Sequence, residues 1–463
     1  MSAIQIEKFR ISIFGFEIYR TVLVNDCVQH YCLGLPIWFS HSPCSVLWHK
    51  ADAFKDFNTR ALDKEVQKLA HSLPFNPPVP EKPTRRRIAY LATELYETGG
   101  HSKLVRDSAY LLNGAAEQKL FLVRLFTTKR QYASGLLSQL ERIMPIFGID
   151  AFWTILNTHW SFKKNVTTIA SAILRYNPTT LFVYSHPNDS RAVAILALVK
   201  RHSKIRIAYV PHASHRPNLG ITLADIVPNA LPSVTKFYES NLNFTNICES
   251  RSFLLTRLND SASIDDAHKA QLKTDIGIPT GAPCTMSGAS SFKFFENDGS
   301  SPYFNLIKRL LERNPDVYHV ILSNFSPWQQ EAIDAIFGSS PSRARLLFQP
   351  FRTDYRDVFS CATVFIDSFP MSSALTMVEL MQLKVPYVVK INRQNSLLSF
   401  HEYQQDGFPY MYESDEQLLL GVETLLRDGT ERKRIANSNL AFFKETYSED
   451  ACRNALLKLI DEI

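Results

Sequence analysis

The sequence predicts an α/β protein built from two doubly wound domains that follow an N-terminal extension. Its 463 residues exceed what one hydrophobic core usually organises, so two domains are expected. Strand-like and helix-like segments alternate twice, in residues 85–265 and again in residues 266–463, and such alternation is typical of parallel sheets. A hydrophobic content of 45% with 21% charged residues fits an ordinary globular chain.

The N-terminal extension, residues 1–84, contains aromatic residues and cysteines but no clear periodicity. It ends in Pro74–Pro83, a proline-rich stretch that predicts an extended linker. The chain has seven cysteines in all, an odd number without CxxC spacing, which favours free thiols over zinc ligands.

The first α/β domain is expected over residues 85–265. Its strands are predicted from apolar runs and its helices from amphipathic segments that follow polar turns. The expected strands are Ile88–Leu91, Phe121–Phe126, Thr180–Tyr184 and Ile205–Val210, and the expected helices are Ser102–Leu112 and Ser190–Arg201.

The second α/β domain is expected over residues 266–463, after the polar stretch Asn259–Asp266. The same pattern of apolar runs and amphipathic segments defines its elements. The expected strands are Cys284–Ser287, Val317–Leu322, Arg345–Phe348, Thr363–Ile366 and Tyr387–Lys390, and helices are expected over Leu418–Arg427 and Glu431–Ile463.

The segment Val364–Val388 is the most informative part of the chain. It predicts a strand, a polar turn, a helix and a second strand, a unit typical of parallel sheets, where ligands bind beyond the strand ends. Ser372, Ser373 and Thr376 fall at the start of the helix, where free N–H groups favour an anion. Glu379, one turn later, is suited to accept hydrogen bonds from a sugar or ribose hydroxyl. The alternative is an ordinary buried unit with a polar turn.

This segment resembles the donor-nucleotide site of GT-B glycosyltransferases. The likeness is to the branch of O-GlcNAc transferase and the bacterial adhesin N-glycosyltransferases, and to related bacterial surface-glycan enzymes. Asp367, Phe369, Pro370 and Glu379 match the pattern in type and spacing. Ser372, Ser373 and Lys384 depart from it, because glycine is usual at those positions.

The resemblance implies a GT-B fold, in which two Rossmann-like domains face a central cleft. The second domain would bind a nucleoside-diphosphate sugar, with a UDP-sugar favoured, and the first would bind the acceptor. It also implies that the last helix, Asp450–Ile463, returns to the first domain.

A glycine-rich loop, Thr98–Arg106, follows the first expected strand. Gly99 and Gly100 let the backbone approach a ligand closely, and Ser102 falls in the first turn of the next helix. The loop is neither a P-loop nor a dinucleotide fingerprint. By resemblance it lies under the donor phosphates and beside the acceptor, so His101 is a candidate for deprotonating the acceptor or contacting the diphosphate. Helix capping is the alternative.

Two further histidines, His212 and His215, follow the strand expected to end at Val210. They resemble a pattern of bacterial glycosyltransferases, except that Ser214 replaces an acidic residue. The resemblance implies contacts to acceptor hydroxyls or to the transferred sugar. A structural role for either histidine is the alternative, and a metal site would need a third nearby ligand.

The loop Ser287–Lys293 follows the first strand of the second domain. Lys293 is placed to neutralise the charge that grows on a departing diphosphate, as a cation does in GT-B relatives. A solvated lysine is the alternative. Asn324 and Phe351 end two other strands, and we expect donor contacts there, with Phe351 either a platform for the base or a core residue.

No metal or resident cofactor is expected, because the sequence lacks the Asp-x-Asp motif that holds a divalent metal in GT-A enzymes. The net charge of +6 suits an anionic ligand but is too small to favour nucleic acid. The acceptor is expected to be a glycan or a protein. Modified phage DNA, a non-catalytic sugar- or nucleotide-binding subunit and a nucleotide-sugar epimerase remain alternatives.

Neither a transmembrane segment nor a signal peptide is predicted. No apolar run approaches the ~20 residues that a spanning helix needs, and the first ten residues lack the basic-then-apolar order of a leader. We therefore expect a cytoplasmic protein.

Overall fold

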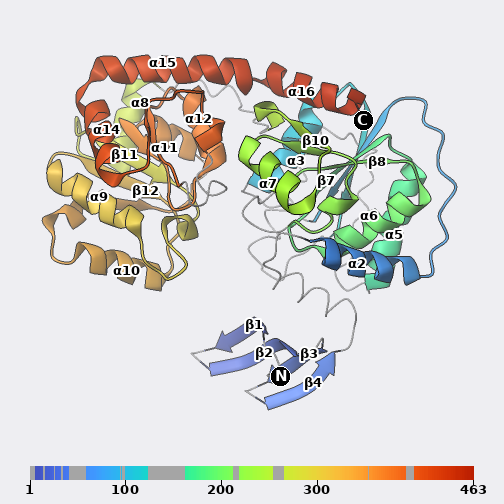
Figure 1. Ribbon diagram of the computed structural model, residues 1–463. Coiled ribbons are helices and arrows are strands. Elements are labelled where there is room, and N and C mark those ends of the chain that lie inside the picture. Colours follow the sequence, from blue (N-terminus) through green and yellow to red (C-terminus); the bar gives the residue numbers. More distant parts are fainter. Residues whose placement is uncertain are drawn as a thin grey trace. The chain divides into compact units, whose positions relative to one another are not determined.

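The computed structural model, drawn in Figure 1, describes most of both α/β regions. The described residues are 6–13, 16–24, 27–32, 35–40, 59–93, 95, 100–123, 162–211, 218–253, 265–352, 354–392 and 401–462. The chain forms two compact units. Unit 1 comprises Met1–Asn229, Val234–Phe253 and Ala455–Ile463, and unit 2 comprises Ala230–Ser233 and Leu254–Asn454.

Unit 1 contains a parallel four-stranded sheet in the order β6-β5-β7-β8. Strands β5 and β7 are buried almost throughout because helices cover the sheet. The strands are β5 (Arg87–Ala92), β6 (Glu117–Leu122), β7 (Thr180–Tyr184) and β8 (Arg206–Tyr209), with a short parallel pair, β9 (Val227–Asn229) and β10 (Ile247–Glu249). The helices are α2 (Arg60–Ser72), α3 (Gly100–Leu111), α5 (Phe162–Tyr176), α6 (Ser190–His202) and α7 (Pro232–Leu242).

Strand β6 starts earlier than its apolar residues predict. The sequence predicts a strand from Phe121, whereas the observed strand begins at Glu117. Its polar first half pairs with β5, where Arg87 Nε donates to a Glu117 carboxylate oxygen at 2.8 Å and the Tyr90 hydroxyl donates to the Gln118 side chain at 2.6 Å. Side-chain pairing thus extends the strand beyond its buried residues.

Helix α2 lies within the residues expected to form an N-terminal extension, yet it packs against α6 of the α/β core. Its Asp63 carboxylate is fully buried and accepts hydrogen bonds from the Gly220 N–H at 2.8 Å and the Thr222 hydroxyl at 2.6 Å. Thr59, one turn earlier, donates to the same carboxylate at 2.9 Å. Helix α2 is therefore part of the packing of unit 1.

The N-terminal segment before α2 forms four antiparallel strands in chain order, which the sequence did not indicate through any clear periodicity. They are β1 (Ile6–Ile13), β2 (Phe16–Val24), β3 (Cys27–Cys32) and β4 (Leu35–Ser40). Register shifts interrupt the β1–β2 and β3–β4 ladders, and a bulge of this kind displaces the two-residue alternation that would mark a strand in the sequence.

Unit 2 contains a parallel sheet in the order β13-β12-β11-β14-β15-β16. The strands are β11 (Cys284–Gly288), β12 (Tyr318–Leu322), β13 (Leu346–Gln349), β14 (Val364–Ile366), β15 (Tyr387–Lys390) and β16 (Met411–Tyr412). The helices are α8 (Asp266–Asp275), α9 (Pro302–Arg313), α10 (Pro327–Phe337), α11 (Tyr355–Ser360), α12 (Ala374–Gln382), α14 (Asp415–Arg427), α15 (Gly429–Thr446) and α16 (Glu449–Glu462).

The order of strands in unit 2 is that of a doubly wound sheet. The chain runs outward from β11 through β12 to β13, then returns past β11 to β14. Right-handed crossovers therefore place α9 and α10 on one face of the sheet and α11 and α12 on the other. The predicted doubly wound parallel sheet, with helices on both faces, is confirmed.

Helix α16 connects the two units through the chain itself. It begins in unit 2, and its residues from Ala455 onward belong to unit 1, where the Arg86 guanidinium donates to the Asp461 carboxylate at 2.6 Å. No helix in the described part of the chain is long and apolar enough to cross a membrane.

Candidate functional site

The reversal of strand order in unit 2 lies between β11 and β14. Ligands of doubly wound sheets bind beyond the carboxyl ends of the strands at such a point. The loop after β11 leads into the 3₁₀ helix η4 (Ser291–Phe294), which carries Lys293, and the loop after β14 carries Asp367 to Ser373. The two loops meet, because the Met371 N–H donates to the Lys293 carbonyl at 3.4 Å.

Asp367 organises the turn between β14 and α12. Its carboxylate, 1% exposed, accepts hydrogen bonds from the Ser368 N–H at 2.9 Å, the Ser373 N–H at 3.0 Å and the Ser373 hydroxyl at 2.7 Å. The Ser372 hydroxyl donates to its other oxygen. Burial raises the pKa of Asp367, while the bonds from Ser372 and Ser373 and the charge of Lys293 lower it. The pKa of Asp367 is raised overall, because burial outweighs these donors and the Lys293 charge, which favour the ionised form.

Lys293 lies beside this carboxylate and holds the same turn. Its ammonium donates to the Ser372 carbonyl at 2.7 Å. Burial lowers the pKa of Lys293, and the nearby Asp367 carboxylate raises it. An ammonium has three N–H donors, and this is the one hydrogen bond that the Lys293 ammonium makes to described residues. Its two other N–H donors have no hydrogen-bond partner among the described residues.

Helix α12 begins directly after this turn without a side-chain cap. Ser373 occupies the N-cap position, but its hydroxyl bonds to Asp367 and not to the helix. Thr376 is half-buried in the first turn, where its N–H donates to the Ser373 carbonyl at 2.7 Å. The remaining N–H groups of the first turn stay available to an anion.

Glu379 is buried on the second turn of α12. Its carboxylate accepts a hydrogen bond from the Tyr355 hydroxyl of α11 at 3.0 Å. Ser373 at the N-cap and Thr376 and Glu379 in the helix thus belong to one short element.

The three departures from the glycine pattern have local explanations. Ser372 and Ser373 direct their hydroxyls to Asp367, so they support the turn that glycines would leave to the backbone. Lys384, after α12, has a φ of 56°, a left-handed conformation that favours glycine. Lysine adopts it here at some cost in backbone energy.

Asn324 and Phe351 meet at the carboxyl ends of the neighbouring strands β12 and β13. The Phe351 N–H points to the Asn324 side-chain oxygen at 3.4 Å, and the Phe351 ring is 52% exposed. Its exposure removes the core interpretation of Phe351 and leaves the ring accessible. Ser323 precedes Asn324, and its buried hydroxyl has no hydrogen-bond partner among the described residues.

Three solved structures with a similar architecture are distant in sequence. A glycosyltransferase from Rickettsia africae ESF-5 superimposes with a TM-score of 0.63 at 13% identity, covering 81% of this chain and 98% of the other. HepE from Anabaena, in complex with UDP and glucose, gives a TM-score of 0.62 at 12% identity, covering 81% and 99%. A variant of the O-GlcNAc transferase from Thermobaculum terrenum gives 0.54 at 15% identity, covering 91% and 78%.

The chain has the GT-B fold. No protein-family model matches the sequence, and no curated protein matches it significantly. The fold predicted from the resemblance is therefore confirmed by structure, at a distance where sequence comparison alone finds nothing.

The acceptor-side residues of the GT-B prediction lie mostly outside the described structure. Gly99, His212 and His215 are not among the described residues, and Gly100 and His101 are placed only as the first backbone positions of α3. Ser102 is buried in the first turn of α3. The expected roles of the three histidines remain predictions.

Several polar residues of unit 2 escape sequence reasoning, although they shape the site. Tyr355 contacts Glu379 from a separate helix, and the sequence offers no signal for this pairing. Asp367 matched the family pattern, but its spacing of five and six residues from Ser372 and Ser373 was the available sign that it folds the turn back on itself.

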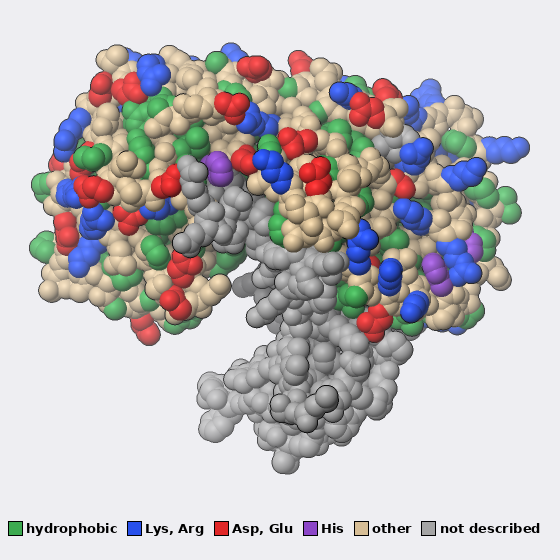
Figure 2. Space-filling model, in the orientation of Figure 1, with side chains coloured by type: hydrophobic (Ala, Val, Ile, Leu, Met, Phe, Trp, Pro, Cys, Tyr) green, Lys and Arg blue, Asp and Glu red, His purple; other side chains and the backbone are tan. Residues whose placement is uncertain are grey.

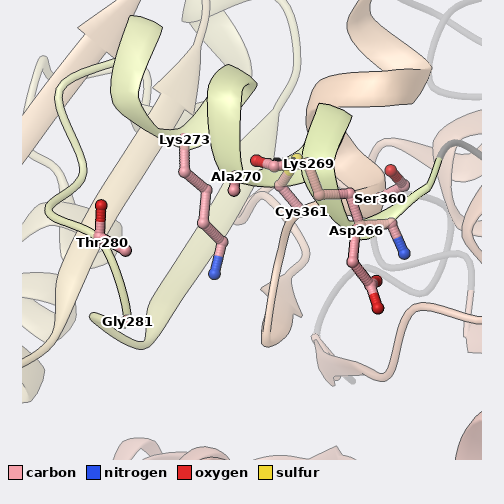
Figure 3. Close-up of a pocket in the computed structure, with 8 residues that line it drawn as sticks. All are labelled: Asp266, Lys269, Ala270, Lys273, Thr280, Gly281, Ser360 and Cys361. Carbon is pink, nitrogen blue, oxygen red and sulfur yellow. Dashed lines mark hydrogen bonds between the residues drawn. The ribbon is translucent and has the colours of Figure 1, made fainter.

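A small pocket of about 260 Å³ lies elsewhere in unit 2, as Figure 3 shows. Its lining includes Thr280 and Gly281, which precede β11, and Ser360 and Cys361, which precede β14. It therefore lies at the amino edge of the sheet, opposite the candidate site. Burial raises the pKa of the Cys361 thiol to about 11, so this thiol is protonated and unreactive at neutral pH.

The face drawn in Figure 2 and the metal-ligand side chains of the described residues give no sign of a second site. On the face shown in Figure 2, Lys and Arg side chains intermingle with Asp and Glu over unit 2, without a uniform basic surface. Within the described ranges, no group of three or more His, Cys, Asp or Glu side chains is placed to hold a metal ion.

Proposed function

We propose that this protein transfers a hexosyl or N-acetylhexosaminyl group from a nucleoside-diphosphate sugar, with UDP as the nucleotide, to a glycan or protein acceptor. Unit 2 would bind the donor and unit 1 the acceptor. The observation that carries the proposal is the pairing of Lys293, which has spare donors, with the uncapped start of α12 at the reversal of strand order. The UDP complex of HepE, a protein of the same fold, supports the choice of nucleotide.

The proposed chemistry is nucleophilic substitution at the anomeric carbon of the sugar. An acceptor oxygen or nitrogen forms a bond to this carbon while the bond to the diphosphate oxygen breaks. The acceptor proton passes to a base, for which His101, His212 and His215 are the candidates. The electron pair of the broken bond stays on the diphosphate, and Lys293 with the N–H groups of α12 stabilises the added charge.

Lys293 and a helix N-terminus would also replace a metal in this mechanism. In the proposed site the Lys293 charge is held beside Asp367, so the lysine is oriented before the donor binds. Such preorganisation lowers the cost of stabilising the leaving group. We therefore propose that catalysis is independent of divalent metal.

Calorimetric titration with UDP, GDP, CDP and ADP tests the donor class. We expect one diphosphate, UDP, to bind in the micromolar range with the same affinity in magnesium and in a chelator. Binding should be lost or strongly weakened in Lys293→Ala. Absence of binding by all four nucleotides would refute the proposal and favour a non-catalytic GT-B subunit.

A second experiment tests group transfer itself. The protein is incubated with UDP-glucose or UDP-N-acetylglucosamine carrying a labelled sugar, with and without glycan and peptide acceptors. Release of UDP together with label on an acceptor supports the proposal. Conversion of the sugar to its epimer without transfer would instead identify an epimerase.

A further inference from the structure

A continuous chain of buried hydrogen bonds runs through the core of unit 2 below the candidate site. It links Thr285 to His319 at 2.7 Å, His319 to Tyr303 at 2.9 Å, and Tyr303 to Ser287. Ser287 then donates to the Ile366 carbonyl at 2.6 Å. All four side chains are fully buried.

Proton counting fixes the direction of every bond in this chain. A carbonyl only accepts, so the single Ser287 hydroxyl proton goes to Ile366, and Ser287 must accept from Tyr303. Burial raises the pKa of Tyr303, which keeps its proton available for this bond. Tyr303 in turn accepts from His319.

His319 supplies that proton as a neutral imidazole. Burial lowers the pKa of His319 to about 3, so the ring carries one proton at neutral pH. With Nε2–H donating to Tyr303, Nδ1 is an acceptor and receives the Thr285 hydroxyl proton. All the hydrogen bonds therefore point the same way along the chain, each group donating to the next one from Thr285 to the Ile366 carbonyl.

The hydrogen-bond chain ends where β11 stops pairing with β14, whereas β15 still pairs with Ile366 and its Val388 carbonyl accepts from the Asp367 N–H at 3.0 Å. The ladder between β11 and β14 pairs Thr285 with Val364 and Met286 with Phe365, and goes no further. The Ser287 hydroxyl bonds the next carbonyl, that of Ile366. Asp367 follows directly, so the hydrogen-bond chain holds the β11 side of the residue from which the site turn departs, while β15 holds its other side.

The ring of Tyr303 supports the same turn from below. Its centroid lies 5.1 Å from that of Phe369, within the turn, and 4.7 Å from that of Phe294, the residue after Lys293. The Tyr303 ring therefore lies against both loops of the candidate site, while its hydroxyl bonds Ser287, which holds the end of β14.

We propose that Tyr303, with His319 and Ser287, is a positioning element that holds the two donor-binding loops at their separation across the β11–β14 reversal. It acts through Asp367 and Lys293 and touches no donor itself. This inference rests on the proposed function where it concerns the nucleotide, whereas its structural part concerns the turn alone.

The test compares two tyrosine-to-phenylalanine changes that each remove one buried hydroxyl from unit 2. Tyr303→Phe interrupts the chain and keeps the ring. Tyr447→Phe is the matched control, because Tyr447 is also fully buried and its hydroxyl donates to the Tyr403 carbonyl at 2.8 Å, outside this chain. Ser287→Ala is a second interruption, should Tyr303→Phe fail to fold.

Three quantities are measured on the full-length protein. They are the dissociation constant of UDP, the midpoint of thermal unfolding, and hydrogen exchange at the Asp367 and Ser373 amides without nucleotide. We expect Tyr303→Phe and Ser287→Ala to weaken UDP binding by about tenfold and to accelerate exchange at both amides. Tyr447→Phe should lower the unfolding midpoint similarly but leave affinity and these amides unchanged.

Equal effects of Tyr303→Phe and Tyr447→Phe on affinity and exchange would overturn the inference, since a general loss of stability would then explain both. If the wild-type protein binds no UDP, the proposed function fails on its own. The exchange measurement still decides the inference in that case, because faster exchange confined to Tyr303→Phe and Ser287→Ala supports it and unchanged exchange overturns it.

Discussion

The two parallel sheets each reverse strand order once, and an aspartate follows the reversal in both, yet the two aspartates do different things. In unit 1, Asp189 immediately precedes α6 and caps it, accepting from the N–H groups of Arg191 at 3.0 Å and Ala192 at 3.2 Å. In unit 2, the Asp367 carboxylate accepts hydrogen bonds from Ser368, Ser372 and Ser373 of its own turn, and α12 has no side-chain cap. Asp189 occupies the N-cap position of α6, whereas Asp367 lies several residues before α12, and this separation in sequence decides whether the carboxylate caps the helix.

The consequence is electrostatic. A capped helix start has its N–H groups satisfied by a carboxylate, which repels a second anion. Thr93, which follows β5, donates to the other oxygen of the Asp189 carboxylate at 2.6 Å, so both oxygens of this carboxylate are hydrogen-bonded. In unit 2 the carboxylate is turned toward its serines and Lys293, so the helix dipole remains free. The comparison shows that the acidic residue before α12 is engaged by its own turn, which is what the proposed anion site at that helix start needs.

The largest effect is expected at the cation of unit 2. Lys293→Ala removes a charged donor and leaves Asp367 buried without its neighbouring charge. A lost hydrogen bond to a charged group costs about 1.5–3 kcal/mol, so the dissociation constant of UDP should rise roughly tenfold to a hundredfold in calorimetry.

Lys308→Ala provides the control for that measurement. Lys308 also lies in unit 2, and its ammonium donates to the Ile336 carbonyl at 2.9 Å, in a contact of the same kind on α9. It should leave UDP affinity unchanged. A similar loss of affinity in both variants would show that Lys293 acts on stability and not on the nucleotide.

The next effect is expected at Glu379. Glu379→Ala should weaken UDP binding by about tenfold, the equivalent of about 1.4 kcal/mol for a lost charged hydrogen bond. Tyr355→Phe removes one hydrogen bond to the carboxylate, leaves the carboxylate in place and should change the affinity little. If the two variants weaken binding equally, Glu379 packs against α11 and does not bind the ribose.

A smaller effect, on stability alone, is expected at the capped helix of unit 1. Asp189→Ala should lower the free energy of unfolding by about 1 kcal/mol, typical of a lost N-cap, measured by denaturant titration. UDP affinity should not change.

Asp367→Asn, by contrast, should reduce both stability and affinity, because its carboxylate orders the donor turn. A drop in UDP affinity for Asp189→Ala would erase the contrast between the two reversals.

Strands of the core were predictable because parallel strands buried on both faces are continuous apolar runs. Thr180–Tyr184 and Tyr387–Lys390 are observed at the predicted bounds. The four antiparallel N-terminal strands and the first half of β6 could not be predicted, because bulges and polar side-chain pairs hide the apolar pattern of a strand. Lys293 and Ser373 were predicted as neighbours of one site, but their link through Asp367 depends on a turn that propensity does not specify.

The smallest effect concerns pH and the buried chain. Because the pKa of His319 is lowered to about 3, the unfolded state binds a proton below pH 6.5 that the native state does not. Stability contributed by the neutral ring is therefore present above pH 6.5 and is lost as the pH falls towards 3. Between pH 8 and pH 6 this loss amounts to about 0.8 kcal/mol.

His319→Gln removes the titrating group, so its free energy of unfolding should fall less than that of the wild type over the same interval. The difference should be confined to unit 2, which hydrogen exchange resolves by comparing strands β11 and β12 with β5 and β7. Equal pH slopes for wild type and variant would mean that His319 titrates near its ordinary pKa. The ring would then be protonated in mild acid, where Nδ1 becomes a donor and the bond between Thr285 and His319 must reverse its direction.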